Sequence, residues 1–198
     1  MRHVAAIVLA AGEASRLGRS KASLRREPGG PTLFRSLLGL LLDSPFHPVL
    51  VVTGARSTVV ARQIRKGDGV RIVHNELWQG GMAGSIRLGV RAVPPDSEGA
   101  LLLGLDQPAL SAQHLQALYS MALLPGKTTI ASLYGGTWGT PAIFARSKFP
   151  ELLALTGRDG AKKLLVPSPS MAFVPFPGGE RDLDTPADVA AWRRGDSA

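Results

Sequence analysis

Apolar positions along this chain fall into two kinds of segment. Short continuous apolar runs are typical of strands that are buried on both faces, and they recur from one end of the chain to the other. Between them lie segments whose apolar residues have the three- and four-residue spacing of helices packed on one side. Strands are predicted at 4–9, 48–53, 70–73, 100–105, 128–133, 142–144 and 171–176. Helices are predicted at 32–42, 57–66, 84–93, 111–123, 147–155, 160–165 and 185–194.

The alternation of strands and helices predicts the fold class. It indicates an α/β protein with a three-layer, Rossmann-like arrangement, in which helices cover both faces of a mainly parallel sheet. No internal repeat, low-complexity tract or long linker divides the 198 residues, so a single domain over 1–198 is expected. In such sheets ligands bind at the carboxyl ends of strands. The segments after the first, third and fourth strands are therefore the places to look for a site.

Composition removes several classes of protein. The chain has no cysteine, which excludes disulfides, thiolate metal sites and cysteine nucleophiles and suits a reducing cytoplasm, where we expect the protein. The apolar run at 4–11 has the length of a signal-peptide core, but it passes directly into a basic, glycine-bearing loop, which favours a buried strand. No run approaches the roughly 20 apolar residues that span a bilayer, so no membrane partner is expected.

Positive charge is concentrated in one loop. The net charge is +8, which allows nucleic acid, an anionic membrane or a polyanionic small molecule as partner. No aromatic residues interleave with the clustered cations to stack on bases, so we expect no nucleic acid and favour a phosphate pocket over a generally basic surface. The clustered cations are Arg16, Arg19, Lys21, Arg25 and Arg26.

The loop after the first strand has the chemistry of a triphosphate site. Its small residues allow a ligand to approach the backbone, and Gly12 and Gly18 permit tight turns whose N–H groups can surround phosphate oxygens. Arg16 and Lys21 would neutralise the phosphates. The spacing is neither that of the dinucleotide fingerprint nor that of the P-loop, and a basic surface loop is the alternative. The nucleotide-binding candidates here are Leu9, Ala10, Ala11, Gly12, Arg16 and Lys21.

Leu-Ala-Ala-Gly followed by Arg-Leu-Gly and Lys resembles the signature of nucleotidyltransferases with the nucleotide-diphospho-sugar transferase fold. The resemblance is strongest to the MobA-like group, which includes the molybdenum cofactor cytidylyltransferases (MocA type) and guanylyltransferases. The cytidylyltransferase branch usually has Ala-Ala-Gly here, whereas the guanylyltransferase branch has Ala-Gly-Gly. The segment 10–12 therefore implies CTP as the donor.

A second motif runs from His74 to Ile86 and contains a polar turn, a glycine pair and a small-residue helix start. Such a segment suits hydrogen bonding of a flat base through backbone groups. Its similarity to the family implies that Gly80, Gly81 and Ser85 lie near the base. His74 is interpreted as structural rather than catalytic.

Asp106 follows the predicted strand 100–105 and is the first candidate metal ligand. A carboxylate in this position can hold Mg²⁺, which prefers oxygen ligands, although an aspartate that only starts the next turn is the alternative. Family members carry a similar Gly-Asp-Gln-Pro. In this chain Leu105 separates Gly104 from Asp106.

Asp182 and Asp184 are the other candidate metal ligands. In a strand they would share one face, and either could complete the magnesium site with Asp106. Alternatively, Asp184 or Thr185 caps the last helix, with Pro186 in its first turn. The pattern does not rank the two carboxylates.

Two segments with family counterparts are candidates for acceptor contacts. Residues 135–141 match a stretch that usually ends Gly-His-Pro or Gly-Asn-Pro, so Thr140 is a departure. Residues 155–161 resemble Gly-Asp-Arg-Gly-Ala with Arg158 and Asp159 exchanged. These differences indicate either another acceptor geometry or variation in surface loops.

The resemblance implies in-line attack by an acceptor phosphate oxygen on the α-phosphorus of the NTP, with release of pyrophosphate. This chemistry depends on positioning and charge stabilisation, with Arg16, Lys21 and Asp106 as the catalytic residues. The implied acceptor is molybdopterin, with a molybdoenzyme as a possible partner. The alternatives are transfer to a sugar or polyol phosphate and a non-catalytic carrier of the molybdenum cofactor.

Overall fold

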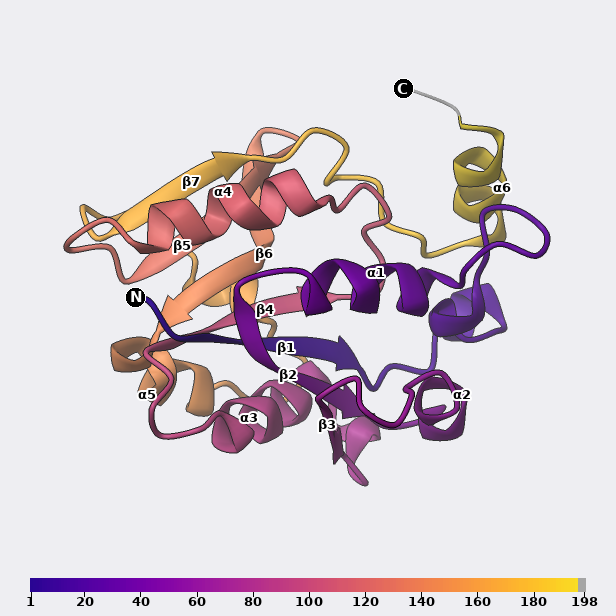
Figure 1. Cartoon of the computed structure of the whole chain (residues 1–198), viewed down its shortest axis with the longest axis horizontal. Helices are drawn as coiled ribbons and strands as arrows, with labels where there is room; N and C mark the ends of the chain where they lie inside the picture. The colour runs from indigo at the N-terminus through magenta and orange to yellow at the C-terminus, as the bar shows by residue number, and fades with distance from the viewer. Residues whose placement is uncertain (196–198) are drawn as a thin grey trace.

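The computed structural model describes residues 1–195 and contains a seven-stranded sheet in the order β3-β2-β1-β4-β6-β5-β7 (Figure 1). The strands are β1 (Val4–Ala10), β2 (Phe46–Thr53), β3 (Val70–His74), β4 (Gly99–Gly104), β5 (Thr129–Tyr134), β6 (Thr137–Ala145) and β7 (Met171–Pro175). The α-helices are α1 (Leu33–Leu42), α2 (Ser57–Ala61), α3 (Met82–Ala92), α4 (Ala112–Ala122), α5 (Phe149–Leu153) and α6 (Pro186–Arg194).

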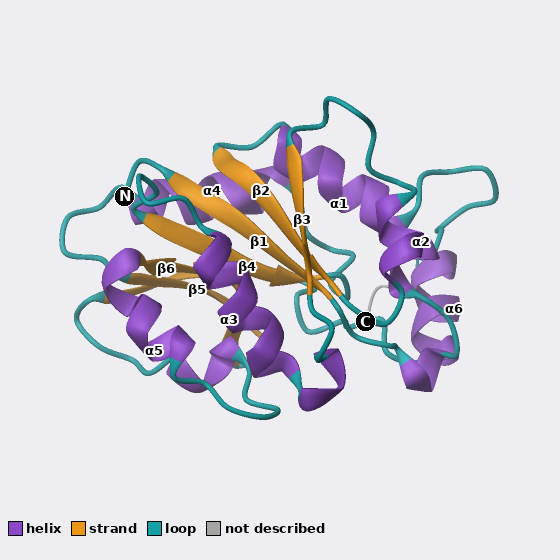
Figure 2. Cartoon of the chain, turned by 90° about the horizontal axis from the view of Figure 1, so that it is seen from below, coloured by secondary structure: helices purple, strands orange, loops and turns teal. Residues whose placement is uncertain are grey.

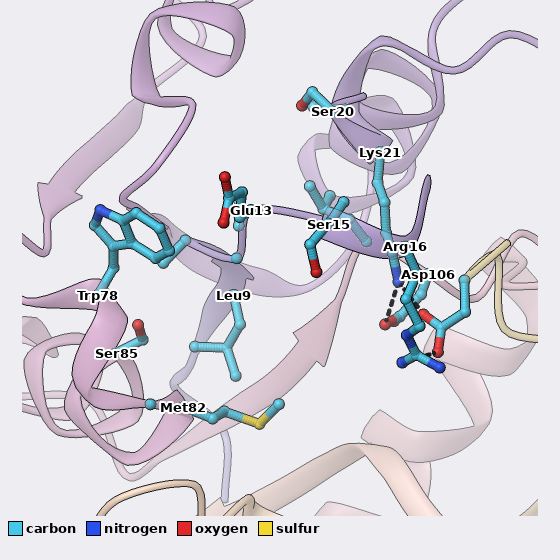
Figure 3. Close-up of a pocket in the computed structure, with 18 of the residues that line it drawn as sticks. Leu9, Glu13, Ser15, Arg16, Ser20, Lys21, Trp78, Met82, Ser85 and Asp106 are labelled. Carbon is cyan, nitrogen blue, oxygen red and sulfur yellow. Dashed lines mark hydrogen bonds and ion pairs between the residues drawn. The ribbon is translucent and has the colours of Figure 1, made fainter. Parts of the chain in front are cut away.

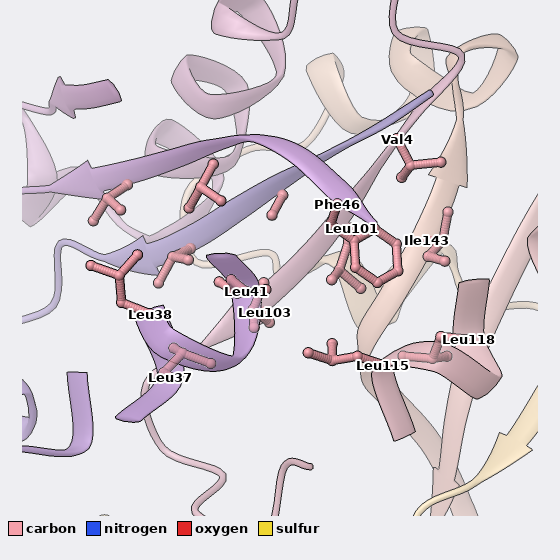
Figure 4. Packing of buried hydrophobic residues seen from close by; sticks show 14 of the residues in the cluster. Val4, Leu37, Leu38, Leu41, Phe46, Leu101, Leu103, Leu115, Leu118 and Ile143 are labelled. Atoms are coloured by element: carbon pink, nitrogen blue, oxygen red, sulfur yellow. The ribbon is translucent and has the colours of Figure 1, made fainter. Parts of the chain in front are cut away.

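Helices lie on both faces of the sheet, as predicted (Figure 2). On β1, Val4, Ala6 and Val8 face a core shared with α1 and α4, whereas Ala5 and Ile7 face a core shared with α3 and α5. Successive strand residues point to opposite faces, so a strand covered on both sides must be apolar at every position. Figure 4 shows how leucines of α1 and α4 pack against the first face.

The sheet is mainly parallel, and β6 is the exception. It pairs antiparallel with both β4 and β5. Gly135 and Gly136 join β5 to β6 in a two-residue turn, and both have positive φ (54° and 70°), the conformation that two-residue hairpin turns require. Strand β6 therefore begins at Thr137, five residues before the predicted strand 142–144.

Three predicted helices are shorter or tighter than expected. Helix α2 ends at Ala61, because the N–H groups of Gln63 and Ile64 bond to carbonyls three rather than four residues back, and that of Arg65 donates to the Asp68 carboxylate. Residues 160–165 form only a short 3₁₀ helix, Ala161–Leu164. The predicted helix 147–155 divides into a 3₁₀ turn, Arg146–Lys148, and α5, which has proline in its first turn.

Two elements begin earlier in the chain than the sequence predicts. Strand β2 begins at Phe46 and helix α3 at Met82, in each case two residues before the predicted start. Helix α4 has the predicted cap, since the Ser111 side chain accepts the N–H of His114. Among the helices of the described chain, none has both the length and the apolar character to cross a membrane.

Candidate active site

The loops at the carboxyl ends of β1 and β4 enclose a cavity of about 510 Å³ (Figure 3). The two strands are neighbours, with Leu9 opposite Gly104, so the segments that follow them meet at one edge of the sheet. The lining residues come from both ends of the chain and from its middle. They are Leu9, Ala10, Ala11, Gly12, Glu13, Ala14, Ser15, Arg16, Ser20, Lys21, Ala22, Trp78, Gln79, Gly81, Met82, Ser85, Leu105, Asp106 and Asp184.

Lys21 lies at the centre of a charged cluster in this cavity (Figure 3). Its Nζ donates to Oδ2 of Asp106 at 3.1 Å and to Oδ1 of Asp184 at 2.6 Å. The second oxygen of Asp184 accepts from Nη2 of Arg16 at 2.8 Å. The Lys21 side chain is only 17% exposed, whereas that of Arg16 is 74% exposed.

These contacts determine the charge states. Burial alone would lower the pKa of the Lys21 ammonium, but its contacts with Asp106 and Asp184 outweigh burial and raise the pKa above its ordinary value. The hydrogen bond from Lys21 in turn lowers the pKa of Asp184. Both groups are therefore charged at neutral pH, as a phosphate- and metal-binding site requires.

Lys21 begins a 3₁₀ helix, Lys21–Ser23, which is anchored to the rest of the protein through Ala22. Ala22 is buried, and its carbonyl accepts from Nε2 of Gln63 at 3.3 Å. The preceding turn, Ser15–Leu17, ends at Gly18 with a φ of 70°, so this glycine has the conformational role expected of it. Gly12 does not have positive φ, and a Cβ there would meet nothing within 4 Å. Its contribution is open space rather than a turn.

Asp184 is positioned by the chain on either side of it. The N–H of Leu183 donates to the carbonyl of Asp106 at 2.9 Å, and the N–H of Asp184 donates to Oδ2 of Asp188 at 3.1 Å. Thr185 caps α6 in a capping box with Asp188, and Pro186 occupies the first turn. Of the two caps that the sequence allowed, Asp184 and Thr185, the structure has Thr185, and Pro186 is in the first turn as expected.

The expectation that Asp182 and Asp184 lie on one face of a strand is wrong. Residues 181–184 form no strand, because Leu183 pairs with the Asp106 loop instead of with the sheet. Only Asp184 lines the cavity. Burial, followed by the nearby charges of Asp106 and Asp184, raises the pKa of Asp182 to about 6.

Within residues 1–195, no three His, Asp or Glu side chains lie close enough together to hold a metal ion. Asp106 and Asp184 nevertheless point oxygens at one position, which the Lys21 ammonium occupies at 3.1 and 2.6 Å. Two carboxylates with phosphate oxygens are a common ligand set for Mg²⁺. The two carboxylates therefore have the chemistry that a magnesium or manganese ion needs, at a position that Lys21 occupies in this structure.

The other end of the cavity is formed by the segment before and within α3 (Figure 3). Ser85 is buried, and its hydroxyl accepts from Nδ2 of Asn75 at 3.0 Å. Gly81 lines the cavity, but Gly80, also predicted near the base, does not. Trp78 and Met82 line it as well and had no predicted role. An aromatic residue directly before a glycine pair, in a chain with few aromatics, was the available signal for Trp78.

The remaining segments singled out by sequence lie outside the cavity lining. His74 lies on β3 with Nδ1 3.2 Å from the Thr53 hydroxyl, a structural contact. In the two candidate acceptor segments, the carbonyl of Thr140 accepts from the Tyr134 hydroxyl at 3.1 Å, and that of Gly157 accepts from the N–H of Ala83 at 3.2 Å.

Comparison with known proteins identifies the family of this chain. Residues 6–171 match the model of the MobA-like NTP transferase domain. The purine catabolism protein PucB of Bacillus subtilis (strain 168) is 28% identical over 201 residues, which cover 95% of each chain. Asp182 and Asp184 lie beyond the residues that match the domain model.

Solved structures share the fold over almost the whole chain. A homologue of Mycobacterium tuberculosis Rv0371c from Mycobacterium sp. strain JC1 has a TM-score of 0.81 and 26% identity, with 98% of each chain covered. Rv0371c from M. tuberculosis H37Rv in complex with manganese has a TM-score of 0.80 and 23% identity, with 98% of this chain and 100% of that one covered.

Proposed function

Because this chain belongs to the MobA-like NTP transferase family, we propose that it transfers CMP from CTP to a phosphate-bearing acceptor in a magnesium-dependent reaction that releases pyrophosphate. Membership of the family makes the chain a nucleotidyltransferase. What we propose in addition is the identity of the donor base, the metal ion and the acceptor. The observation that carries it is the convergence of Arg16, Lys21, Asp106 and Asp184 on one cavity beside a small-residue loop.

Arg16 and Lys21 bind the triphosphate. Both cations point into the cavity from the loop after β1, whose backbone approaches the ligand at Ala10, Ala11 and Gly12. Nothing stands within 4 Å of where a Gly12 side chain would project, so phosphate oxygens have room there. Cations aimed at the α-phosphate stabilise the charge that develops as pyrophosphate leaves.

Asp106 and Asp184 hold the metal ion, and Asp184 is favoured over Asp182 because only Asp184 reaches the cavity. When bound, the ion screens repulsion between the phosphates of donor and acceptor. The manganese complex of Rv0371c, a protein of the same fold, supports the use of a divalent ion. Since an acceptor phosphate is already an anionic nucleophile, neither a catalytic serine nor a histidine is required.

We assign the cytosine base to the part of the cavity lined by Leu9 and Trp78 (Figure 3). A Cβ on Gly54 would come 3.0 Å from Cβ of Ala11 and 2.7 Å from Cβ of Trp78, so Ala11 and Trp78 meet over Gly54. Both residues also line the cavity. The choice of cytosine rests on the cytidylyltransferase-like Ala10-Ala11-Gly12.

The acceptor we favour is the terminal phosphate of molybdopterin, by resemblance to the molybdenum cofactor branch of the family. The product would be a dinucleotide form of the cofactor for a molybdoenzyme. There are two alternatives: an enzyme whose acceptor is a sugar or polyol phosphate, and a cofactor carrier without catalytic activity. An activity measurement distinguishes both from the proposed function.

Pyrophosphate release with each of CTP, GTP, ATP and UTP, in the presence of Mg²⁺ and molybdopterin, tests the proposal. We expect the highest kcat/KM with CTP. Lys21→Ala and Asp106→Ala should each lower kcat/KM by at least about 100-fold, because each removes a charge aimed at the reacting phosphates. Lys148→Ala, which removes a lysine paired with Glu151 near α5, is the matched control and should leave the rate unchanged.

Each other outcome contradicts one part of the proposal. A preference for GTP would make the donor base wrong. Tight CTP binding without pyrophosphate release would favour the carrier, unless a sugar or polyol phosphate restores release. Equal loss in Lys148→Ala would show that the effect of Lys21→Ala is not specific to the cavity.

A further inference from the structure

Asp184 contacts both cations that the proposed function assigns to the triphosphate. Its two carboxylate oxygens accept from Lys21 at 2.6 Å and from Arg16 at 2.8 Å. These partners are 163 and 168 residues away along the chain. In the ligand-free protein both cations are therefore already paired with one carboxylate of the C-terminal segment, and Lys21 is also paired with Asp106.

Asp184 is the fixed partner in these contacts. The neighbouring Leu183 is 2% exposed and packs with Leu17, Leu24 and Val189. The backbone on both sides is held by hydrogen bonds, from Leu183 to the carbonyl of Asp106 and from Asp184 to Asp188. Arg16 and Lys21 have long side chains, and Arg16 is 74% exposed. When a ligand enters, the cations must turn while the carboxylate stays.

We propose that Asp184 makes this site selective for a triphosphate that carries a divalent metal ion. The inference rests on the proposed function. A metal-free triphosphate that takes Lys21 and Arg16 leaves the Asp184 carboxylate uncompensated beside the incoming anion. With the metal complex, Asp106 and Asp184 exchange the Lys21 ammonium for the metal ion, and Lys21 and Arg16 turn to the phosphates. The carboxylate thus opposes one ligand and assists the other.

Asp182 provides the matched control. It belongs to the same segment and carries the same type of charge, but it does not line the cavity, whereas Asp184 does. A general reduction in negative charge would therefore act in both variants. Loss of a carboxylate that competes with the triphosphate for Lys21 and Arg16 would act only in Asp184→Asn.

The test measures the affinity of CTP for wild type, Asp184→Asn and Asp182→Asn at pH 8, first with EDTA and then with Mn²⁺. We expect Asp184→Asn to bind metal-free CTP about tenfold more tightly than wild type, the scale of one or two partly exposed ion pairs. The same variant should bind the Mn²⁺ complex more weakly than wild type. Asp182→Asn should change metal-free binding by less than about threefold, since it breaks no contact with Lys21 or Arg16.

Mn²⁺ binding to the nucleotide-free protein, measured by electron paramagnetic resonance, gives the reciprocal result. In Lys21→Ala the ammonium no longer occupies the position between Asp106 and Asp184, so Mn²⁺ should bind several-fold more tightly than to wild type. Lys148→Ala, distant from the cavity, should bind Mn²⁺ as wild type does.

The inference is overturned if Asp184→Asn binds metal-free CTP no more tightly than wild type, or if Asp182→Asn tightens it equally. Asp184→Ala should also bind metal-free CTP more tightly than wild type, and it replaces Asp184→Asn in the test if the asparagine variant does not fold. Because both readouts are binding constants, failure here with intact pyrophosphate release overturns the selectivity alone. Failed release with the expected binding pattern overturns the reaction and leaves the selectivity standing.

Discussion

At the scale of single residues, Gly81 limits what the nucleotide side of the cavity can tolerate. It has a φ of 107°, and a Cβ there would lie 2.2 Å from the carbonyl oxygen of Gly157. The same carbonyl accepts the N–H of Ala83 at 3.2 Å. The backbone before α3 and the loop at Gly157 are therefore in direct contact, and no side chain fits between them.

Gly81→Ala should lower the free energy of unfolding by about 1–3 kcal/mol, because alanine is strained at this φ and must push the Gly157 backbone away. The KM for the NTP should rise, since Gly81 lines the cavity. Urea unfolding and steady-state kinetics measure the two effects. Gly84→Ala, within α3, is the control: its Cβ would be 3.5 Å from Nδ2 of Asn75, an ordinary contact, and alanine favours the helix, so the variant should be at least as stable as wild type. If Gly81→Ala is as stable as wild type, the backbone at Gly157 moves to make room for the methyl group without lowering the free energy of unfolding.

At the scale of elements, His114 joins α4 to β5. It is 7% exposed, and Nε2 lies 2.8 Å from the Ser132 hydroxyl. The ring stacks on Phe176 with centroids 4.2 Å apart. Burial lowers the pKa of this imidazole to about 4 from an ordinary value of 6.5. The folded protein thus keeps His114 neutral where the unfolded chain would protonate it.

Acid should therefore destabilise this packing in a defined range. Above pH 6.5 neither state protonates His114, whereas between pH 6.5 and 4 only the unfolded chain takes up the proton. From pH 7.5 to 5 this group should remove about 2 kcal/mol from the free energy of unfolding. Urea unfolding of wild type and His114→Gln at both pH values isolates the effect, since the variant should lose less stability on acidification. Equal losses would show that His114 is not the titrating group.

At the scale of the whole molecule, the cavity depends on contact between the two ends of the described chain. Leu17 and Leu24 from the N-terminal segment and Leu33 at the start of α1 form a small buried cluster with Leu183 and Val189. This cluster holds α6 and Asp184 against the loop that carries Arg16 and Lys21. The proposed metal ligand and the proposed phosphate ligands are therefore aligned by apolar packing as well as by charge.

Leu183→Ala should lower the free energy of unfolding by about 2–4 kcal/mol, because it leaves a cavity in this cluster. It should also weaken binding of CTP with Mn²⁺, since Asp184 loses the side chain that anchors its segment. Urea unfolding and a CTP titration measure both. Leu77→Ala, at an 81% exposed leucine, should change stability by less than about 0.5 kcal/mol. If Leu183→Ala binds CTP as wild type does, the anchor is not needed for the site.

The sequence by itself determined the α/β class, the main strands and the first loop as the place of the cavity. Those features depend on local periodicity and on residue types that act near their own position, as with Lys21 and Asp106. It did not determine the direction of β6, the position of Asp184 rather than Asp182 at the cavity, or the exclusion of Gly80 from the cavity lining.

The tertiary structure decided these because each depends on partners far away along the chain. Asp182 and Asp184 are chemically identical and two residues apart, so no local pattern distinguishes them. The difference arises when the N–H of Leu183 bonds to Asp106 and its side chain enters a cluster built from the N-terminal segment. That packing directs the carboxylate of Asp184 to Lys21 and Arg16. The contact with Lys21 spans 163 residues, and the local periodicity of the sequence carries no information about contacts over such a distance.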